Sequence, residues 1–166
     1  LFAYTGGAPL AAAAAGATVT HVDASKGMVT WAKENAVSSG LKDAPIRWLV
    51  DDCVKFVERE IRRGNTYDAI IMDPPSYGRG PKGEIWKIED MIHPLIRLCA
   101  KILSEDALFF LVNSYTTGLA PAVLTYMIST ELKSWNGHVD SQEIGLPVTN
   151  SGLVLPCGAS GRWESR

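Results

Sequence analysis

The stretch YDAIIMDPPSY, residues 67–77, decides the fold that the sequence predicts. Its first part, Tyr67 to Met72, is almost wholly apolar, which is typical of a strand buried on both faces of a sheet. The motif Asp73-Pro74-Pro75 stops this strand, because proline donates no ladder hydrogen bond and forces the residue before it out of helical geometry. We therefore predict a buried strand ending in a stiff, extended spur that carries the Asp73 carboxylate.

Segments with the patterns of strands and helices alternate on both sides of this stretch. The predicted strands are Thr18 to Val22, Ile46 to Val50 and Ala107 to Val112; the predicted helices are Ser25 to Ser38, Cys53 to Arg63, Glu84 to Leu103 and Leu119 to Leu132. A loop, Ser76 to Gly83, follows the spur, and Val139 to Trp163 forms two strands around Asn150-Ser151-Gly152. This alternation predicts an α/β fold with a parallel sheet, helices on both faces, and a ligand site at the strands' carboxyl ends.

Length and composition limit the class of protein. The 166 residues, 46% of them hydrophobic, fit one soluble globular domain that spans residues 1–166. No apolar run reaches the roughly 20 residues of a membrane helix. The three cysteines are widely spaced, so we expect a cytoplasmic protein without disulfides, metal or membrane contact. The formal net charge of −2 argues mildly against nucleic-acid binding by this piece alone.

The first residues, Leu1 to Gly7, read as the end of a strand that runs straight into a turn. Since a complete domain rarely begins within a strand, we expect the chain to be truncated at its N-terminus, with its first strand largely missing. Gly6 and Gly7 would allow a ligand to approach the backbone closely, and the following helix offers free N–H groups. The alternative is a tight strand-to-helix turn that binds nothing.

Acidic residues follow two further predicted strands. Asp23 lies roughly 20 residues after the glycine turn, the spacing at which a carboxylate accepts hydrogen bonds from a ribose hydroxyl pair. The alternative for Asp23 is helix capping, in competition with Ser25. Asp51 and Asp52 precede the helix that begins at Cys53. They could accept from an adenine amine, cap that helix, or divide these two tasks.

The strings FAYTGGA, VDASK, DDC and MDPPSYGRG resemble, in this order, the motifs of class I methyltransferases. Within that class the chain resembles the large-subunit ribosomal RNA methyltransferases that act on cytosine or guanine. The likeness extends from Leu1 to about Val112, and more weakly through the closing GRWE. It implies a Rossmann-like, seven-stranded sheet whose last strand is antiparallel, with S-adenosylmethionine as the cofactor.

The resemblance also implies a role for each motif. The turn with Phe2, Tyr4, Thr5, Gly6 and Gly7 would wrap the methionine part of the cofactor. Asp23, with Ala24 and Ser25, would hold the ribose, while Asp52 and Cys53, next to Asp51, would hold the adenine edge. Asp73, stiffened by Pro74 and Pro75, would sit beside the transferable methyl as the catalytic group.

A missing cysteine separates this chain from relatives that methylate C5 of cytosine. That carbon is a poor nucleophile, so the reaction needs a cysteine thiolate to attack the ring first. Those relatives carry the cysteine just after the strand that is here Ala107 to Val112, where this chain has Asn113-Ser114-Tyr115-Thr116. We interpret Cys53 and Cys157 as small buried residues. We hypothesise direct transfer to a nitrogen or oxygen atom, with Asp73 holding an amine proton.

RNA as the substrate is implied mainly by the resemblance. Local support comes from a mixture of cations and rings after the spur, because rings stack on unpaired bases and cations bind phosphate. The candidate substrate-binding residues are Ser76, Tyr77, Arg79 and Lys82. A solvated loop is the alternative for this segment. For the whole chain, the alternatives are a methyltransferase for a small molecule or a protein amine, and a module that binds the cofactor without turnover.

Overall fold

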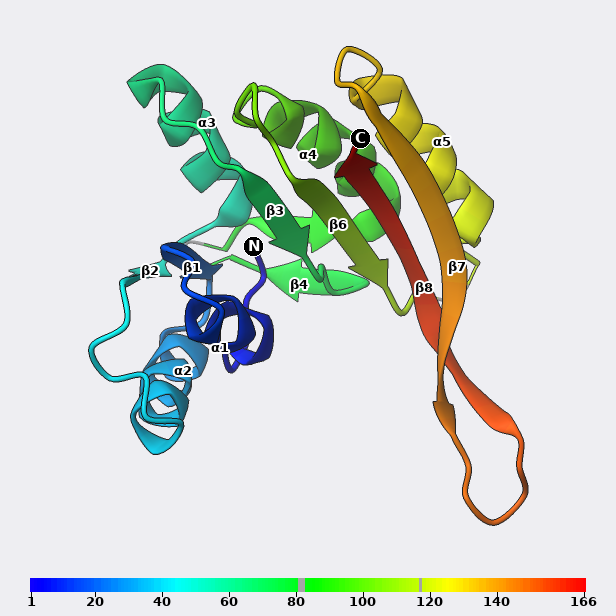
Figure 1. Ribbon diagram of the computed structural model, residues 1–166, viewed down its shortest axis with the longest axis horizontal. Coiled ribbons are helices and arrows are strands. Elements are labelled where there is room, and N and C mark those ends of the chain that lie inside the picture. The colour runs from blue at the N-terminus through cyan, green and yellow to red at the C-terminus, as the bar shows by residue number, and fades with distance from the viewer. Residues whose placement is uncertain (81–82, 117) are drawn as a thin grey trace.

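The predicted alternation of strands and helices is confirmed in the computed structural model, which describes residues 1–80, 83–116 and 118–166 (Figure 1). The helices are α1 Gly7–Ala14, α2 Lys26–Ser38, α3 Cys53–Arg63, α4 Ile88–Ala100 and α5 Pro121–Glu131. The strands are β1 Val19–Asp23, β2 Ile46–Val50, β3 Ala69–Met72, β4 Tyr77–Arg79, β5 Ile85–Lys87, β6 Phe109–Ser114, β7 Gly137–Pro147 and β8 Val154–Ser165.

The longer strands form two separate hydrogen-bonded groups. β1 pairs with β2 in parallel, and a second group has the order β3-β6-β8-β7. β3 and β6 are parallel, whereas β8 runs antiparallel to both β6 and β7, which confirms an antiparallel strand at the C-terminus. The registers Asp23↔Val50 and Met72↔Val112 align the carboxyl ends within each parallel pair. Within each parallel pair, the residues that follow the two strands therefore begin at the same edge of the sheet.

The first residues of the chain connect the two strand groups. The Leu1 amine donates a hydrogen bond to the Ile71 carbonyl at 2.7 Å, and the Ala3 N–H donates to the Val22 carbonyl at 3.1 Å. One end of the chain thus bonds to β3 on one side and to β1 on the other. This places the turn that starts at Phe2 between the carboxyl ends of two strands that are not themselves paired.

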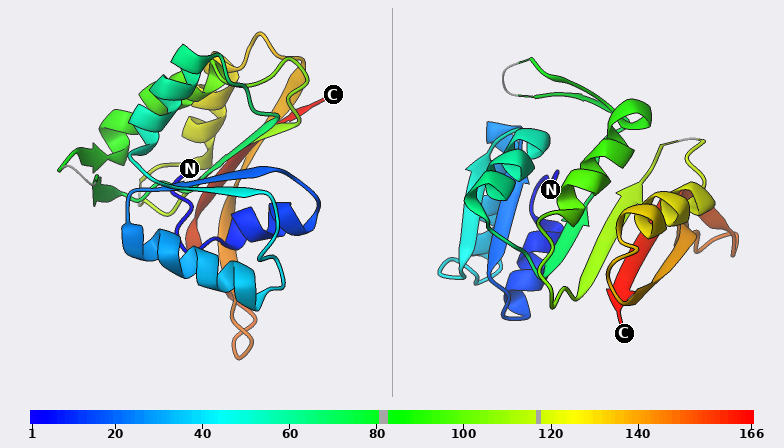
Figure 2. Two further views of the ribbon diagram at one scale, coloured as in Figure 1. Left: turned by 90° about the vertical axis from the view of Figure 1, so that its left-hand side faces the viewer. Right: turned by 90° about the horizontal axis from the view of Figure 1, so that it is seen from above.

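Helices cover the sheet unevenly. α1 and α2 lie on the β1–β2 end of one face, and α3, α4 and α5 lie on the other face (Figures 1 and 2). The core lies between the second set of helices and the strands, and its largest fully buried apolar side chains are Phe110, Met72, Ile88, Leu95, Ile96, Ile102, Leu124, Ile128 and Leu132. Among the described residues, no helix has both the length and the apolar character that a membrane crossing requires.

The segment after the spur differs from the prediction. Ser76 to Gly83 was expected to be a loop and Glu84 to Leu103 a helix. The first expectation is wrong for Tyr77–Arg79 and the second for Ile85–Lys87, which are strands, whereas Ile88–Ala100 is helical as predicted. β4 and β5 form an antiparallel pair in which Tyr77 lies opposite Lys87. The buried Trp86 indole donates to the Pro75 carbonyl at 2.6 Å, which fixes the segment as a strand and delays the helix to Ile88.

The C-terminal end of α4 and the start of β3 are also shorter than predicted, for one shared reason. α4 ends at Ala100, and β3 begins at Ala69 rather than Tyr67. Tyr67 instead forms an isolated parallel bridge with Leu103, and its N–H donates to the Ile102 carbonyl at 2.8 Å. Because Tyr67 pairs with Leu103, Tyr67 does not extend β3 and Leu103 does not extend α4.

The helix ends follow the predicted capping. The Ser25 hydroxyl accepts a hydrogen bond from the Met28 N–H, and α3 begins with the same arrangement between Asp52 and the Lys55 N–H. Gly64 ends α3 with a left-handed φ of 69°, a conformation that glycine adopts without steric cost. These local signals therefore fix where α2 and α3 begin and where α3 ends.

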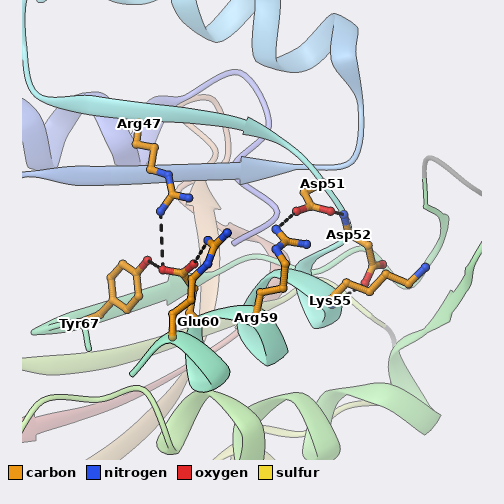
Figure 3. Close-up of polar contacts among 8 residues, drawn as sticks. Arg47, Asp51, Asp52, Lys55, Arg59, Glu60 and Tyr67 are labelled. Atoms are coloured by element: carbon orange, nitrogen blue, oxygen red, sulfur yellow. Dashed lines mark hydrogen bonds and ion pairs between the residues drawn. The ribbon is translucent and has the colours of Figure 1, made fainter. Parts of the chain in front are cut away.

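A buried carboxylate, Glu60 of α3, joins three elements of the fold (Figure 3). Its side chain is completely buried and accepts hydrogen bonds from Arg63, Asn65 and Tyr67 at 2.8–2.9 Å. Arg47 of β2 lies 3.6 Å away. Burial acts to raise the pKa of Glu60, but the hydrogen bonds and the Arg47 charge outweigh it, so the pKa is lowered.

Replacing Glu60 with glutamine should lower the free energy of unfolding by about 2 kcal/mol at neutral pH, because the three donors lose a buried, charged acceptor. A lowered folded-state pKa contributes stability above the unfolded carboxyl pKa and loses it as the pH falls through the folded-state value. Urea denaturation should therefore show the difference between wild type and Glu60→Gln shrinking in acid. Glu58→Gln, an exposed exchange on the same helix, is the control. An equal loss in both variants would contradict this account.

Candidate functional site

A hollow of about 520 Å³ lies at the carboxyl ends of β1, β2, β3 and β6; we call it the strand-end hollow. It gathers residues from all four stretches that the sequence singled out. The predicted residues that line it are Phe2, Tyr4, Asp23, Ala24, Ser25, Asp52, Cys53, Asp73, Pro75 and Arg79. Val54, Gly80, Trp86 and Tyr115 complete the lining and were not among the predicted site residues.

Several predicted site residues lie outside this lining. Pro74 is buried within the spur, Tyr77 is exposed on β4, and the Ser76 hydroxyl lies 2.7 Å from the Thr116 hydroxyl. Asp51 forms an ion pair with Arg59 on α3 (Figure 3). Thr5, Gly6 and Gly7 shape the turn without lining the hollow, and Lys82 falls outside the described residues.

The turn from Phe2 to Gly7 has an unusual backbone. Phe2 and Tyr4 have φ angles of 53° and 47°, in the left-handed region that non-glycine residues rarely adopt. Gly6 has a φ of 90°, and a Cβ there would lie 3.1 Å from the Ala32 Cβ, so both the backbone conformation and the close packing favour glycine. Such strained conformations persist where surrounding contacts hold them, and they concentrate at ligand sites.

Asp23 is held by backbone donors on both of its carboxylate oxygens. Oδ2 accepts from the Tyr4 N–H at 2.9 Å, and Oδ1 accepts from the Ser25 N–H at 2.8 Å. An ionised carboxylate has about four lone-pair positions, so each oxygen can accept one more hydrogen bond. Asp23 thus lines the strand-end hollow with a carboxylate whose orientation is fixed by two backbone donors.

Asp52 takes the capping role that the sequence left open, and it also lies in the hollow. Its Oδ1 accepts from the Lys55 N–H at 2.9 Å as the cap of α3, and the residue also lines the strand-end hollow. Its neighbour Asp51 is turned toward Arg59 and also accepts from the Asp52 N–H at 3.0 Å. Of the two acids, Asp52 is therefore the one placed to meet a ligand.

Asp73 lies at the rim of the strand-end hollow beside two exposed rings. Partial burial raises the pKa of its carboxyl group. Tyr4 and Tyr115 are 61% and 54% exposed, and both line the hollow with Asp73. The pKa of Tyr115 is raised first by desolvation and then by the negative charge of Asp73. A carboxylate that shares a hollow with two exposed aromatic rings is suited to a planar group that carries a hydrogen-bond donor.

Cys53 lines the strand-end hollow, but its thiol is buried. It is 3% exposed, and its Sγ accepts a hydrogen bond from the Phe2 N–H at 3.3 Å. Burial raises the pKa of Cys53 to about 12, so the thiolate that a nucleophile requires is scarce at neutral pH. Cys157 lies on β8, away from the lining, and donates to the Leu155 carbonyl. It is only partly buried, so the interpretation of Cys157 as a buried residue is wrong.

The β4–β5 pair forms one side of the strand-end hollow. Arg79 and Gly80 line the hollow, and the Trp86 ring packs against Phe2 with centroids 4.9 Å apart. An ion pair between Lys55 and Glu84 also ties this segment to α3. Arg79, predicted to meet the substrate, therefore shares a hollow with the residues predicted to meet the cofactor. Among the described residues, no group of three or more His, Cys, Asp and Glu side chains could hold a metal ion.

Sequence comparison connects the chain to ribosomal RNA methyltransferases. It is 38% identical over 105 residues to the ribosomal RNA large subunit methyltransferase K/L of Pseudoalteromonas atlantica, covering 62% of this chain and 14% of that protein. It is 30% identical over 116 residues to the ribosomal RNA large subunit methyltransferase K of Neisseria meningitidis, covering 69% of this chain and 33% of that one. The chain thus spans a third or less of the length of these relatives.

Structural comparison and a family pattern agree with this connection. A crystal structure of a SAM-dependent methyltransferase from Agrobacterium tumefaciens is 43% identical, with a TM-score of 0.94, covering 100% of this chain and 55% of that chain. The pattern of the S-adenosylmethionine-dependent methyltransferases matches residues 1–136, which include every residue that lines the strand-end hollow. The chain belongs to this family of S-adenosylmethionine-dependent methyltransferases.

Proposed function

We propose that this chain binds S-adenosylmethionine in the strand-end hollow and transfers its methyl group to a nucleobase of ribosomal RNA. The observation that carries the proposal is the convergence of Asp23, Asp52 and Asp73, from the ends of three different strands, on one hollow. In open α/β sheets, ligands bind at this edge. The volume of about 520 Å³ is in the usual range for cofactor sites.

The lining residues fit the parts of the cofactor. Asp23 offers the two remaining acceptor positions that a ribose diol needs, and Asp52 can accept from the adenine amine. The turn from Phe2 to Gly7 would surround the methionine part, with the faces of Phe2 and Tyr4 available to a positive sulfur. Asp73 would then lie next to the methyl.

The chemistry divides between the cofactor and the chain. When bound, the cofactor supplies a methyl group on a positively charged sulfur. The chain's own task is to place an acceptor atom in line with that methyl, at about 3 Å. Asp73 would hold the proton of an attacking amine, since the spur of Pro74 and Pro75 fixes its backbone. Tyr4 and Tyr115 would hold the flat base between their rings.

A nitrogen or oxygen acceptor needs no cysteine, so Cys53→Ala should keep its methyl-transfer activity. The buried thiol is a poor nucleophile because its pKa is about 12. We expect a small loss of stability from the vacated volume and a single-turnover rate constant within about threefold of wild type. Single-turnover transfer to the RNA substrate measures this, and Cys157→Ala is the second variant. If either variant lost all turnover but still bound the cofactor, the result would instead support covalent methylation at C5 of cytosine.

RNA as the substrate rests on the names of the relatives and on the exposed rings and cation at the hollow. Labelled S-adenosylmethionine incubated with the chain and total RNA, followed by digestion to nucleosides, tests it directly. We expect label in a modified base, at a nitrogen or oxygen atom. Label that appears only in protein or small molecules would instead support the other methyltransferase classes. Cofactor binding without transfer to any of these acceptors would identify a binding module.

The sheet is proposed to reach seven strands through a strand that precedes Leu1 and lies between β1 and β3. In the described residues these two strands each pair on one side only, and residues 1–3 already bond to both of them. A longer chain with such a strand should unfold at a higher temperature than this one. An unchanged unfolding temperature would contradict the seven-stranded arrangement.

A further inference from the structure

His21 of β1 is a buried polar residue that the proposed reaction does not use. Its side chain is 0% exposed and does not line the strand-end hollow. Nε2 lies 3.1 Å from the Tyr4 carbonyl oxygen, and the ring packs against Trp48 of β2 with centroids 5.0 Å apart. The ring therefore fills a space between two strands and the turn.

The protonation of His21 follows from its surroundings. Burial lowers its pKa, with opposing contributions from the Tyr4 carbonyl and the Asp23 charge, so the ring is neutral near pH 7. Because the Tyr4 carbonyl can only accept, Nε2 must carry the proton and donate it. Nδ1 then keeps a lone pair, and it has no hydrogen-bond partner in the part of the chain that the structure describes.

A buried ring with one unsatisfied nitrogen is less favourable than an apolar side chain of similar size. Local choices that lower stability without a compensating structural gain concentrate at functional sites. The one bond that His21 makes in return goes to Tyr4, whose φ of 47° is strained. Any effect of His21 on function therefore acts through the turn that contains Tyr4.

Tyr4 is fixed from both sides of its backbone by residues of one strand. Its N–H donates to Asp23 Oδ2 at 2.9 Å, and its carbonyl accepts from His21 at 3.1 Å. Residues 21 and 23 are two apart in β1 and so project from the same face of the strand. The Ala3 N–H adds a bond to the Val22 carbonyl between them. Any movement of the Tyr4 backbone would therefore change one of the two contacts that orient the Asp23 carboxylate.

We propose that His21 is a positioning residue for cofactor binding, which fixes the Tyr4 backbone and through it the orientation of Asp23 toward the ribose. The inference rests on the proposed ribose contact of Asp23. It assigns to a buried histidine the selectivity of the site for the ribose hydroxyls, although the histidine touches no part of the ligand.

Two variants separate the donor from the volume of the ring. In His21→Gln the amide nitrogen can reach the position of Nε2 and donate to Tyr4, whereas His21→Leu fills the space without a donor. Calorimetry measures the affinity of each for S-adenosylhomocysteine and for its 2′-deoxy analogue. Wild type should prefer S-adenosylhomocysteine about tenfold or more, the worth of a hydrogen bond to a charged group. His21→Gln should keep this preference, and His21→Leu should lose most of it together with about tenfold in affinity.

The ratio of the two affinities identifies the reason for any failure. A merely structural role would weaken both ligands equally in His21→Leu and leave the preference intact, which would overturn the inference. A wild-type protein without the preference would instead overturn the ribose contact of Asp23. Nitrogen-15 chemical shifts of the wild-type His21 ring give a test that needs no variant. The Nε2–H tautomer is expected with and without S-adenosylhomocysteine, and an Nδ1–H tautomer would refute the inference.

Discussion

Replacing Asp73 with asparagine should lower the rate of methyl transfer by about a hundredfold to ten-thousandfold, the usual contribution of a positioned proton acceptor. Asparagine preserves the shape of the side chain and the spur of Pro74 and Pro75. It removes the negative charge that would hold the acceptor's proton. The affinity for S-adenosylhomocysteine should stay close to wild type, because Asp73 would act on the substrate side of the hollow. Single-turnover kinetics and calorimetry measure these two quantities separately.

The pH dependence of the same reaction provides a second readout for Asp73. The carboxyl must be ionised to accept a proton, and burial raises its pKa above the ordinary value. The wild-type rate should therefore fall in acid, with a midpoint above that of an ordinary aspartate. The residual rate of Asp73→Asn should lack this limb. Asp106→Asn, an exposed exchange at the opposite end of β6, is the control and should behave as wild type. An acid limb that persists in Asp73→Asn would assign the titration to another group.

Replacing Asp23 with alanine should weaken the binding of S-adenosylhomocysteine by about a hundredfold, the combined worth of hydrogen bonds to a charged acceptor. The variant loses both acceptor positions for the ribose and also the contact that holds the Tyr4 N–H. The Asp23→Asn variant retains one acceptor oxygen, so its affinity for S-adenosylhomocysteine should lie between those of Asp23→Ala and wild type. Calorimetry at fixed pH measures the three affinities. If Asp23→Ala bound S-adenosylhomocysteine as tightly as wild type, the ribose could not be held by Asp23.

The fold could be predicted well wherever a short segment carries its own signal. The apolar run before Asp73 and the capping residues Ser25 and Asp52 place strands and helix starts correctly, because burial and capping act over a few residues. The β4–β5 pair was missed because the run Ile85-Trp86-Lys87 is short and merges with the helical pattern after it. Its strand character depends on a partner and on the Trp86 bond to Pro75, which local patterns cannot show.

The same distinction applies to the strand-end hollow. Asp23, Asp52 and Asp73 could be singled out because each follows a strand, and the structure brings them together. Tyr115 also directly follows a strand, β6, so the same rule applies to it. The sequence at this position was used only to show that a cysteine is missing. His21 could not have been found, since a histidine within an apolar strand gives no sign of the carbonyl it meets.

The central claim is that the strand-end hollow holds the cofactor with its sulfur facing Asp73. A crystal structure of this chain with S-adenosylhomocysteine tests it most directly. The account predicts ribose hydroxyls within hydrogen-bond distance of Asp23, the adenine beside Asp52, and the sulfur turned toward Asp73 and Tyr115. Binding outside this hollow, or with the sulfur on the far side of the adenosine from Asp73, would contradict it.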